Sequence, residues 1–155
     1  MRARAHRPLA LALLALLHAS GCGGDAALRA GEVTIAGTTV AVEIAATPEQ
    51  RAQGLSGRAQ LEPGRGMLFF HEEPGAHGYW MKDMHFAIDI LWLRNGRIVD
   101  VAHRAQPAAP GTPDAALRVY GPRVDADAVL EVPAGFARAH GWDVGARVAI
   151  EAPGR

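Results

Sequence analysis

Short runs of alternating hydrophobic and polar positions recur along the chain and predict a protein built mainly of strands. Residues 32–36 and 38–45 are rich in β-branched side chains, and Gly37 stands between the two runs as a turn point. Alternation with a period of two places one set of side chains on each face of a strand. The pattern therefore predicts a β-hairpin, or two sequential strands, at the start of the folded region.

Six further strand-like runs follow, and one pair is joined by the clearest turn signal of the chain. These runs are residues 67–70, 79–82, 88–93, 97–103, 128–132 and 146–151. Asn95-Gly96 lies between runs 88–93 and 97–103, and this dipeptide tolerates the positive φ of tight hairpin turns. The stretch 105–126 is rich in Pro, Ala, Gly and Asp and predicts a long loop.

Two short helices complete the predicted elements. Thr47 can cap a helix that starts at Pro48, and Gln50 completes a capping box. A second short helix is expected over residues 134–140, closed by Gly141. Seven to eight short strands with two short helices indicate an α+β class, β-rich, with a mostly antiparallel sheet that is rolled or barrel-like.

The first 21 residues differ from the rest and predict a lipoprotein-type signal peptide. Three arginines precede an apolar run from Leu9 to Leu17, and small residues lead to Cys22. This run is shorter than the roughly 20 apolar residues that span a bilayer. Cys22 resembles the cysteine of a bacterial lipobox, which is lipidated and becomes the new N-terminus. The pattern predicts an exported, lipid-anchored protein of the bacterial cell envelope facing the periplasm; a secreted or soluble periplasmic protein is the alternative.

Composition sets further bounds on the mature chain. Residues 22–31 are expected to form a flexible tether, and residues 32–151 a single globular domain. Loss of the leader removes three of the 16 basic residues, so 13 face 16 acidic ones. This weakly acidic balance favours no nucleic-acid partner. Cys22 is the one cysteine, which excludes an internal disulfide and a site built from several thiolates.

Several motifs, in order and spacing, resemble those of the domain of unknown function 192 family, small prokaryotic domains often carried on exported proteins. The motifs occupy residues 51–58, 66–70, 80–84, 88–90, 96–99 and 129–135. The resemblance extends over residues 33–151 and implies a fold but no established activity. This chain departs from the usual family pattern at Asp83, at Ala87-Ile88 and at Ala128.

Charged residues inside strand-like runs are the first candidates for a site, because a charge in a strand interior needs a partner. One interpretation is a cleft that binds a small anionic ligand or another envelope component. The other is a set of ion pairs that hold the strands in register. A hydrolase that uses Asp89 or Glu131 with Lys82 and Arg58 is the alternative function. The full set of ligand-binding candidates is Arg51, Arg58, Lys82, Asp83, Asp89 and Glu131.

Imidazole and thioether groups form a weaker candidate set for a metal such as copper. Its members are His71, His77, Met81 and His85. Their spacing is irregular, and the methionines lie beside aromatic residues as core residues do. We therefore expect neither a metal nor another cofactor.

Overall fold

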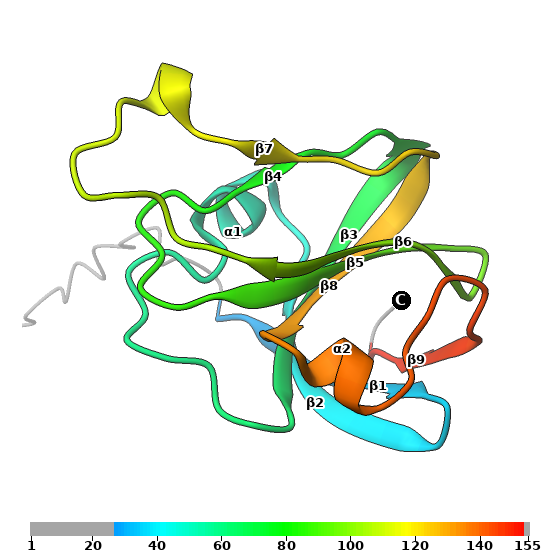
Figure 1. Ribbon diagram of the computed structural model, residues 1–155. Helices are drawn as coiled ribbons and strands as arrows, with labels where there is room; N and C mark the ends of the chain where they lie inside the picture. Colours follow the sequence, from blue (N-terminus) through cyan, green and yellow to red (C-terminus); the bar gives the residue numbers. More distant parts are fainter. Residues whose placement is uncertain (1–26, 154–155) are drawn as a thin grey trace, which may run out of the picture.

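A curled seven-stranded sheet organises residues 27–153, which the computed structural model describes (Figure 1). Its strand order is β6-β5-β8-β3-β2-β1-β9, and every pairing except the parallel pair β2–β3 is antiparallel. The strands are β1 (Arg29–Ile35), β2 (Thr38–Ala45), β3 (Arg65–Gly75), β5 (Ile88–Arg94), β6 (Arg97–Ala105), β8 (Ala126–Pro133) and β9 (Val148–Glu151). The predicted β-rich class with a rolled, mostly antiparallel sheet is confirmed.

The sheet curls into a half-barrel whose two edge strands approach each other at one end. Arg97 forms an isolated antiparallel bridge with Arg147, next to the turn between β5 and β6. The Ile98 amide donates to the Ala146 carbonyl at 3.0 Å, and the Val148 amide donates to the Gly96 carbonyl at 2.8 Å. These bonds protect part of the open edges, which would otherwise present unpaired backbone groups.

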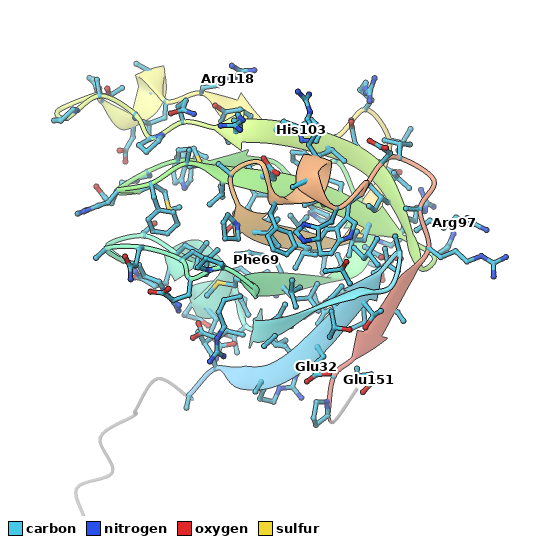
Figure 2. All side chains as sticks on the ribbon, turned by 60° about the horizontal axis from the view of Figure 1, so that its bottom comes forward. Glu32, Phe69, Arg97, His103, Arg118 and Glu151 are labelled. Atoms are coloured by element: carbon cyan, nitrogen blue, oxygen red, sulfur yellow. The ribbon has the colours of Figure 1, made fainter. Side chains whose placement is uncertain are left out.

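The central strands are buried on both faces, and each face has its own core. On the concave side, Leu68, Leu91 and Leu130 pack with Trp142 and with residues of β1 and β2. On the other face, Met67, Phe69, Ile90, Trp92 and Val129 pack under a second layer. Figure 2 shows Phe69 turned inward, whereas Arg97 and Arg118 project from the surface. Burial on both faces explains why β5 reads as a nearly continuous apolar run.

The second layer contains α1 (Pro48–Gln53) and the two-stranded sheet of β4 (Tyr79–Trp80) and β7 (Val119–Tyr120). The predicted capping box of α1 is confirmed. The Gln50 amide donates to Thr47 Oγ1, and the Thr47 amide donates to Gln50 Oε1. Two helical N–H groups are thereby satisfied without water, which fixes the end of β2 relative to the helix.

Several boundaries differ from those predicted. β1 starts at Arg29, so residues 29–31 of the expected tether pair with β2. β3 continues to Gly75, and β4 has only two residues. The predicted loop 105–126 contains β7 and a 3-10 helix, η1 (Asp114–Ala116). The second helix, α2, spans only Phe136–Ala139.

The described residues contain no helix long and apolar enough to cross a membrane. The predicted signal peptide and Cys22 lie outside the described part of the chain.

Candidate functional site

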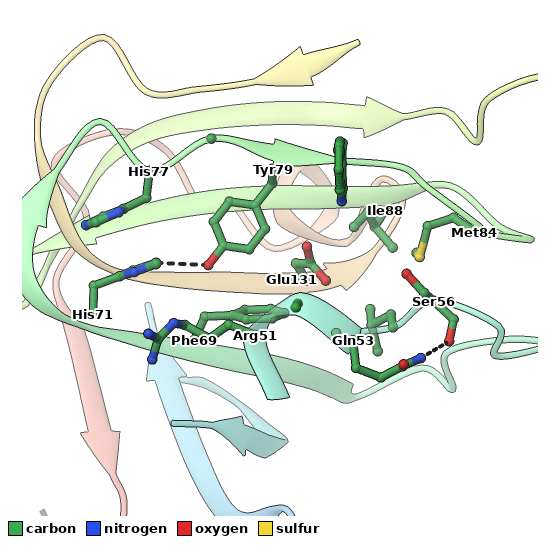
Figure 3. Close-up of a pocket in the computed structure, with 15 residues that line it drawn as sticks. Arg51, Gln53, Ser56, Phe69, His71, His77, Tyr79, Met84, Ile88 and Glu131 are labelled. Carbon is green, nitrogen blue, oxygen red and sulfur yellow. Dashed lines mark hydrogen bonds between the residues drawn. The ribbon is translucent and has the colours of Figure 1, made fainter. Parts of the chain in front are cut away.

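A pocket of about 310 Å³ opens between the convex face of the sheet and the layer formed by α1 and β4. Its floor comes from Phe69 of β3, Ile88 of β5 and Glu131 of β8. Its walls come from α1, the segment after α1, and β4. Figure 3 shows these side chains converging on one space from elements distant in the sequence.

Glu131 is the buried acid of this pocket. Its register partners are Met67 of β3 and Ile90 of β5, so its side chain projects from the same face as theirs. The residue is only 5% exposed, and burial raises the pKa of its carboxyl to about 8. No side chain or backbone group of the described residues forms a hydrogen bond or ion pair with this carboxyl. Figure 3 shows the carboxyl directed into the pocket between Tyr79 and α1.

Two histidines and Tyr79 form the polar wall beside Glu131. The Tyr79 hydroxyl and His71 Nε2 are hydrogen-bonded at 3.0 Å, and the His71 and His77 rings are stacked with centroids 3.5 Å apart. Burial, with the nearby charges of His77 and Arg51, lowers the pKa of His71 to about 4, so this ring is neutral at neutral pH. Burial and the negative charge of Glu131 raise the pKa of Tyr79, which keeps its hydroxyl protonated.

Arg51 lines the pocket, but its guanidinium is engaged by the backbone. Nη1 donates to the Ala46 carbonyl at 2.7 Å and to the Phe70 carbonyl at 3.1 Å. These bonds link α1 to the end of β2 and to the middle of β3. Arg51 therefore positions the wall of the pocket.

The remaining lining is largely apolar and aromatic. Leu55, Met84 and Ile88 contribute aliphatic surface, and Trp80 stands at the rim with 47% of its surface exposed. Ser56 also lines the pocket, but its hydroxyl donates to the Lys82 carbonyl at 2.8 Å. An apolar body and a few polar groups at one end are typical of small-molecule sites.

Comparison with known proteins places the chain in a family. The model of the domain of unknown function 192 family (DUF192), described as "Uncharacterized ACR", matches residues 31–150. The chain belongs to the DUF192 family. The resemblance found in the sequence motifs is thereby confirmed. No curated protein matches the chain.

Two solved structures resemble this DUF192 chain. A Sinorhizobium meliloti protein, provisionally described as a transcription regulator, is 30% identical with a TM-score of 0.71, and the match covers 81% of this chain and 97% of that one. A Novosphingobium aromaticivorans protein of unknown function is 26% identical with a TM-score of 0.69, and the match covers 87% and 91% of the two chains.

The DUF192 motifs meet at the pocket although the chain separates them. Residues 51–58 give α1 and the segment after it, 66–70 give the middle of β3, and 129–135 give Glu131. The departures from the family pattern lie beside these motifs. Asp83 is exposed in a turn with φ 53°, and Ala128 is buried next to Phe70.

The six predicted binding residues do not share one cleft. Arg58 is ion-paired with Glu43, and Lys82 Nζ lies 2.5 Å from an oxygen of Asp114. The hydrogen bond that Lys82 donates to Asp114 raises the pKa of Lys82, which therefore stays charged. Only Arg51 and Glu131 of the six line the pocket described above.

Asp89 has a different environment from Glu131. It is completely buried, and its two oxygens accept bonds from the Arg104 amide at 2.8 Å and from the Ala137 amide at 3.0 Å. These bonds join β6 and the first turn of α2 to β5. The geometry is that of a buried carboxylate that stabilises the fold.

The four metal candidates are also divided. His71 and His77 reach the pocket wall, whereas the buried Met81 and the exposed His85 line a separate surface depression. Within residues 27–153, no group of three or more His, Cys, Asp or Glu side chains could hold a metal ion. His71 and His77 contribute hydrogen bonding and stacking instead.

Tyr79 is a polar residue of the pocket that the sequence did not single out as a candidate. The sequence signal for Tyr79 was the two-residue alternation of residues 79–82, which places neighbouring side chains on opposite faces of a strand. Tyr79 and Met81 pack into the core, whereas Trp80 and Lys82 face outward with Lys82 Nζ 5.5 Å from the Trp80 ring centroid.

Proposed function

We propose that this DUF192 chain is a small-ligand-binding domain whose binding site is the pocket at Glu131. The observation that carries the proposal is the Glu131 carboxyl, which is buried, directed into the pocket and without a partner among the described residues. No fully buried side-chain atom of the described residues lacks a hydrogen bond, so the Glu131 carboxyl, which has no protein partner, meets the open space of the pocket. A ligand there can supply the partner that the protein does not.

The size and chemistry of the pocket support the proposal. Its volume of about 310 Å³ lies at the lower end of the range for small-molecule sites, roughly 300–1,000 Å³. Tyr79, His71 and Glu131 form a polar end, and apolar side chains form the rest. A ligand with one polar group and a compact apolar body would fit this division.

The alternative hydrolase has less geometric support. Paired-carboxylate hydrolysis needs two carboxyl groups that face one scissile bond. Asp89 is bonded to backbone amides at α2, whereas Glu131 faces the pocket. Lys82 and Arg58 are paired with other acids. The raised pKa of Glu131 would suit a general acid, but a second reacting group would have to be found.

A role in binding nucleic acid receives no support from the chain itself. The regulatory role provisionally given to the Sinorhizobium meliloti protein concerns that protein. The mature chain predicted here has fewer basic than acidic residues, and association with DNA relies on Lys and Arg at the phosphates.

The location we propose is the cell envelope, with a lipid anchor at Cys22 that holds the domain at a membrane on the periplasmic side. The support is the leader pattern before Cys22. A Cys22→Ser variant should still be exported but should leave the membrane fraction. Membrane retention of this variant would contradict the anchor, and wild-type protein found only in the soluble periplasm would favour the alternative.

The pocket can be tested by filling it. Ala52 is an exposed pocket-lining residue of α1, so Ala52→Trp places a large ring there without altering the core. Ala59→Trp, at another exposed alanine outside the pocket, is the matched control. We expect a fragment library screened by ligand-observed NMR to yield binders that Ala52→Trp loses and Ala59→Trp retains. Equal binding by both variants, or no binders to the wild type, would contradict the proposal.

A further inference from the structure

The charge balance of the pocket indicates which ligands it binds. We infer that the ligand is a small organic cation, an amine or ammonium compound, whose charged group lies at Glu131 and whose apolar body lies along Leu55, Met84 and Ile88. This inference rests on the proposed function, because it names the ligand class of the same pocket.

The first argument is that Glu131 lacks a positive partner within the described structure. Burial is the cause of its raised pKa, and no cation counteracts it. Arg51, a permanent cation that lines the pocket, is bonded to two backbone carbonyls. A ligand cation at Glu131 would favour the ionised carboxylate, because an opposite charge within a few ångströms stabilises it.

The second argument concerns the aromatic rings. Phe69, Tyr79 and Trp80 line the pocket, and the faces of such rings attract cations. Trp80 stands at the rim and faces outward, where Lys82 Nζ lies 5.5 Å from its ring centroid, so Phe69 and Tyr79 are the rings inside the pocket. Phe69 and Tyr79 are packed edge to face with centroids 5.0 Å apart, which holds both rings in place.

The third argument is that the pocket offers little to an anion. His71 is neutral at neutral pH, and its Nε2 is bonded to Tyr79. Arg58 and Lys82, the other basic residues expected to bind an anion, are ion-paired outside the pocket. Above pH 8, where Glu131 is ionised, a carboxylate or phosphate in the pocket would also be repelled by the like charge of Glu131.

The test compares three probes of similar shape and different charge: benzylammonium, benzyl alcohol and benzoate. Each is titrated into the full-length protein near pH 8.5, and binding is followed through the NMR signals of Leu55 and Ile88. We expect benzylammonium to bind at least about tenfold more tightly than the other two. In Glu131→Gln, benzylammonium should lose about tenfold in affinity, while benzyl alcohol should change less than about twofold.

A pH comparison in the wild type does not depend on any variant folding correctly. Benzylammonium stays charged between about pH 6.5 and pH 8.5, whereas Glu131 ionises near pH 8. Its affinity should therefore rise roughly tenfold over this range. The other titratable or charged groups at the pocket are Arg51, His71, His77 and Tyr79. A His77→Gln variant tests the contribution of that ring and should retain the rise.

The outcomes separate the inference from the proposed function. The inference of a cationic ligand would be overturned by a preference for benzyl alcohol or benzoate, or by unchanged benzylammonium affinity in Glu131→Gln. Either result would leave the proposal of a binding pocket intact. An affinity that does not rise with pH would overturn it too. If none of the three probes shifts the signals of Leu55 and Ile88 at millimolar concentration, the cation is overturned, and the fragment screen then decides whether the pocket binds anything else.

Discussion

The carboxyl groups of Asp89 and Glu131 lie on the neighbouring strands β5 and β8 and project from opposite faces of the sheet. Val132 is the register partner of Asp89, and Ile90 is the partner of Glu131, so the two acids are offset by one residue in the strand register. Because side chains alternate along a strand, this offset sends one acid to α2 and the other to the pocket. One acid has two amide donors, and the other has none within the described structure.

Replacement of Asp89 by Asn should destabilise the protein. An amide in place of the carboxylate turns an NH₂ group toward the Arg104 or the Ala137 amide, so one buried N–H loses its acceptor. We expect the free energy of unfolding to fall by about 3 kcal/mol, measured by urea denaturation. Asp83→Asn, at an exposed position, is the control and should change it little. Equal stability of the two variants would contradict a stabilising role for Asp89.

Glu131 should make the stability of the protein depend on pH. Its pKa is about 8 in the folded protein against an ordinary 4.5, so the folded state binds more protons between these values. Stability should therefore fall as the pH rises from about 4.5 to about 8 and then level off. The total loss should be on the order of 4 kcal/mol.

The check is urea unfolding of the wild type and of Glu131→Gln at several pH values. Gln cannot ionise, so the variant should lack this component and should be the more stable protein above pH 8. Parallel pH profiles for the two proteins would show that Glu131 does not titrate in this way.

The capping box of α1 should stabilise the pocket wall. Thr47→Ala removes the hydroxyl that accepts from the Gln50 amide and should cost about 1 kcal/mol of unfolding free energy. Thr47→Ser keeps the hydroxyl and should restore most of it. Thermal unfolding followed by circular dichroism measures both variants. If Ser and Ala give the same loss, the hydroxyl is not the stabilising group.

Arg123 should hold the long segment before β8 against the sheet. Its guanidinium donates to both oxygens of Asp100, at 3.0 and 2.7 Å, and lowers the pKa of that carboxyl. Asp100 is thus ionised and paired at neutral pH, and the contact weakens as the pH falls through its lowered pKa. We expect Arg123→Ala to increase cleavage between residues 106 and 122 in limited proteolysis at neutral pH.

The control for Arg123 is Arg147→Ala, an exposed arginine beyond this segment. It should leave the proteolytic pattern unchanged. Resistance of the Arg123→Ala protein to cleavage would mean that other contacts hold the segment.

Local signals in the sequence predicted local structure well. Asn95 and Gly96 adopt the expected positive φ values of 51° and 67°, and Thr47 and Gln50 form the expected capping box. Each of these signals involves residues within a few positions of one another. The energetics of such turns and caps depend little on the rest of the fold.

The candidate site could be predicted only in part, because it is made by distant residues. Glu131 was named as a candidate, but its grouping with Asp89 ignored the face on which each one lies. Lys82 was expected at a ligand and instead meets Asp114, 32 positions away. β7 was missed because Val119 and Tyr120 form a strand only through pairing with β4.

The position of β1 between β2 and β9 makes the order of folding depend on a strand more than 100 positions away in the sequence. The Trp142 indole donates to the Ile35 carbonyl across 107 positions, and Figure 2 shows Glu32 beside Glu151 at the same edge. A nascent chain can form the hairpin of β1 and β2 early, but the concave core lacks Trp142 until residues 142–151 have emerged. Closure of long loops slows such pairing. During synthesis, the hydrogen-bonding edge of β1 therefore remains open to other strands, and the time before β9 arrives is when this protein is most exposed to aggregation or to capture by a chaperone.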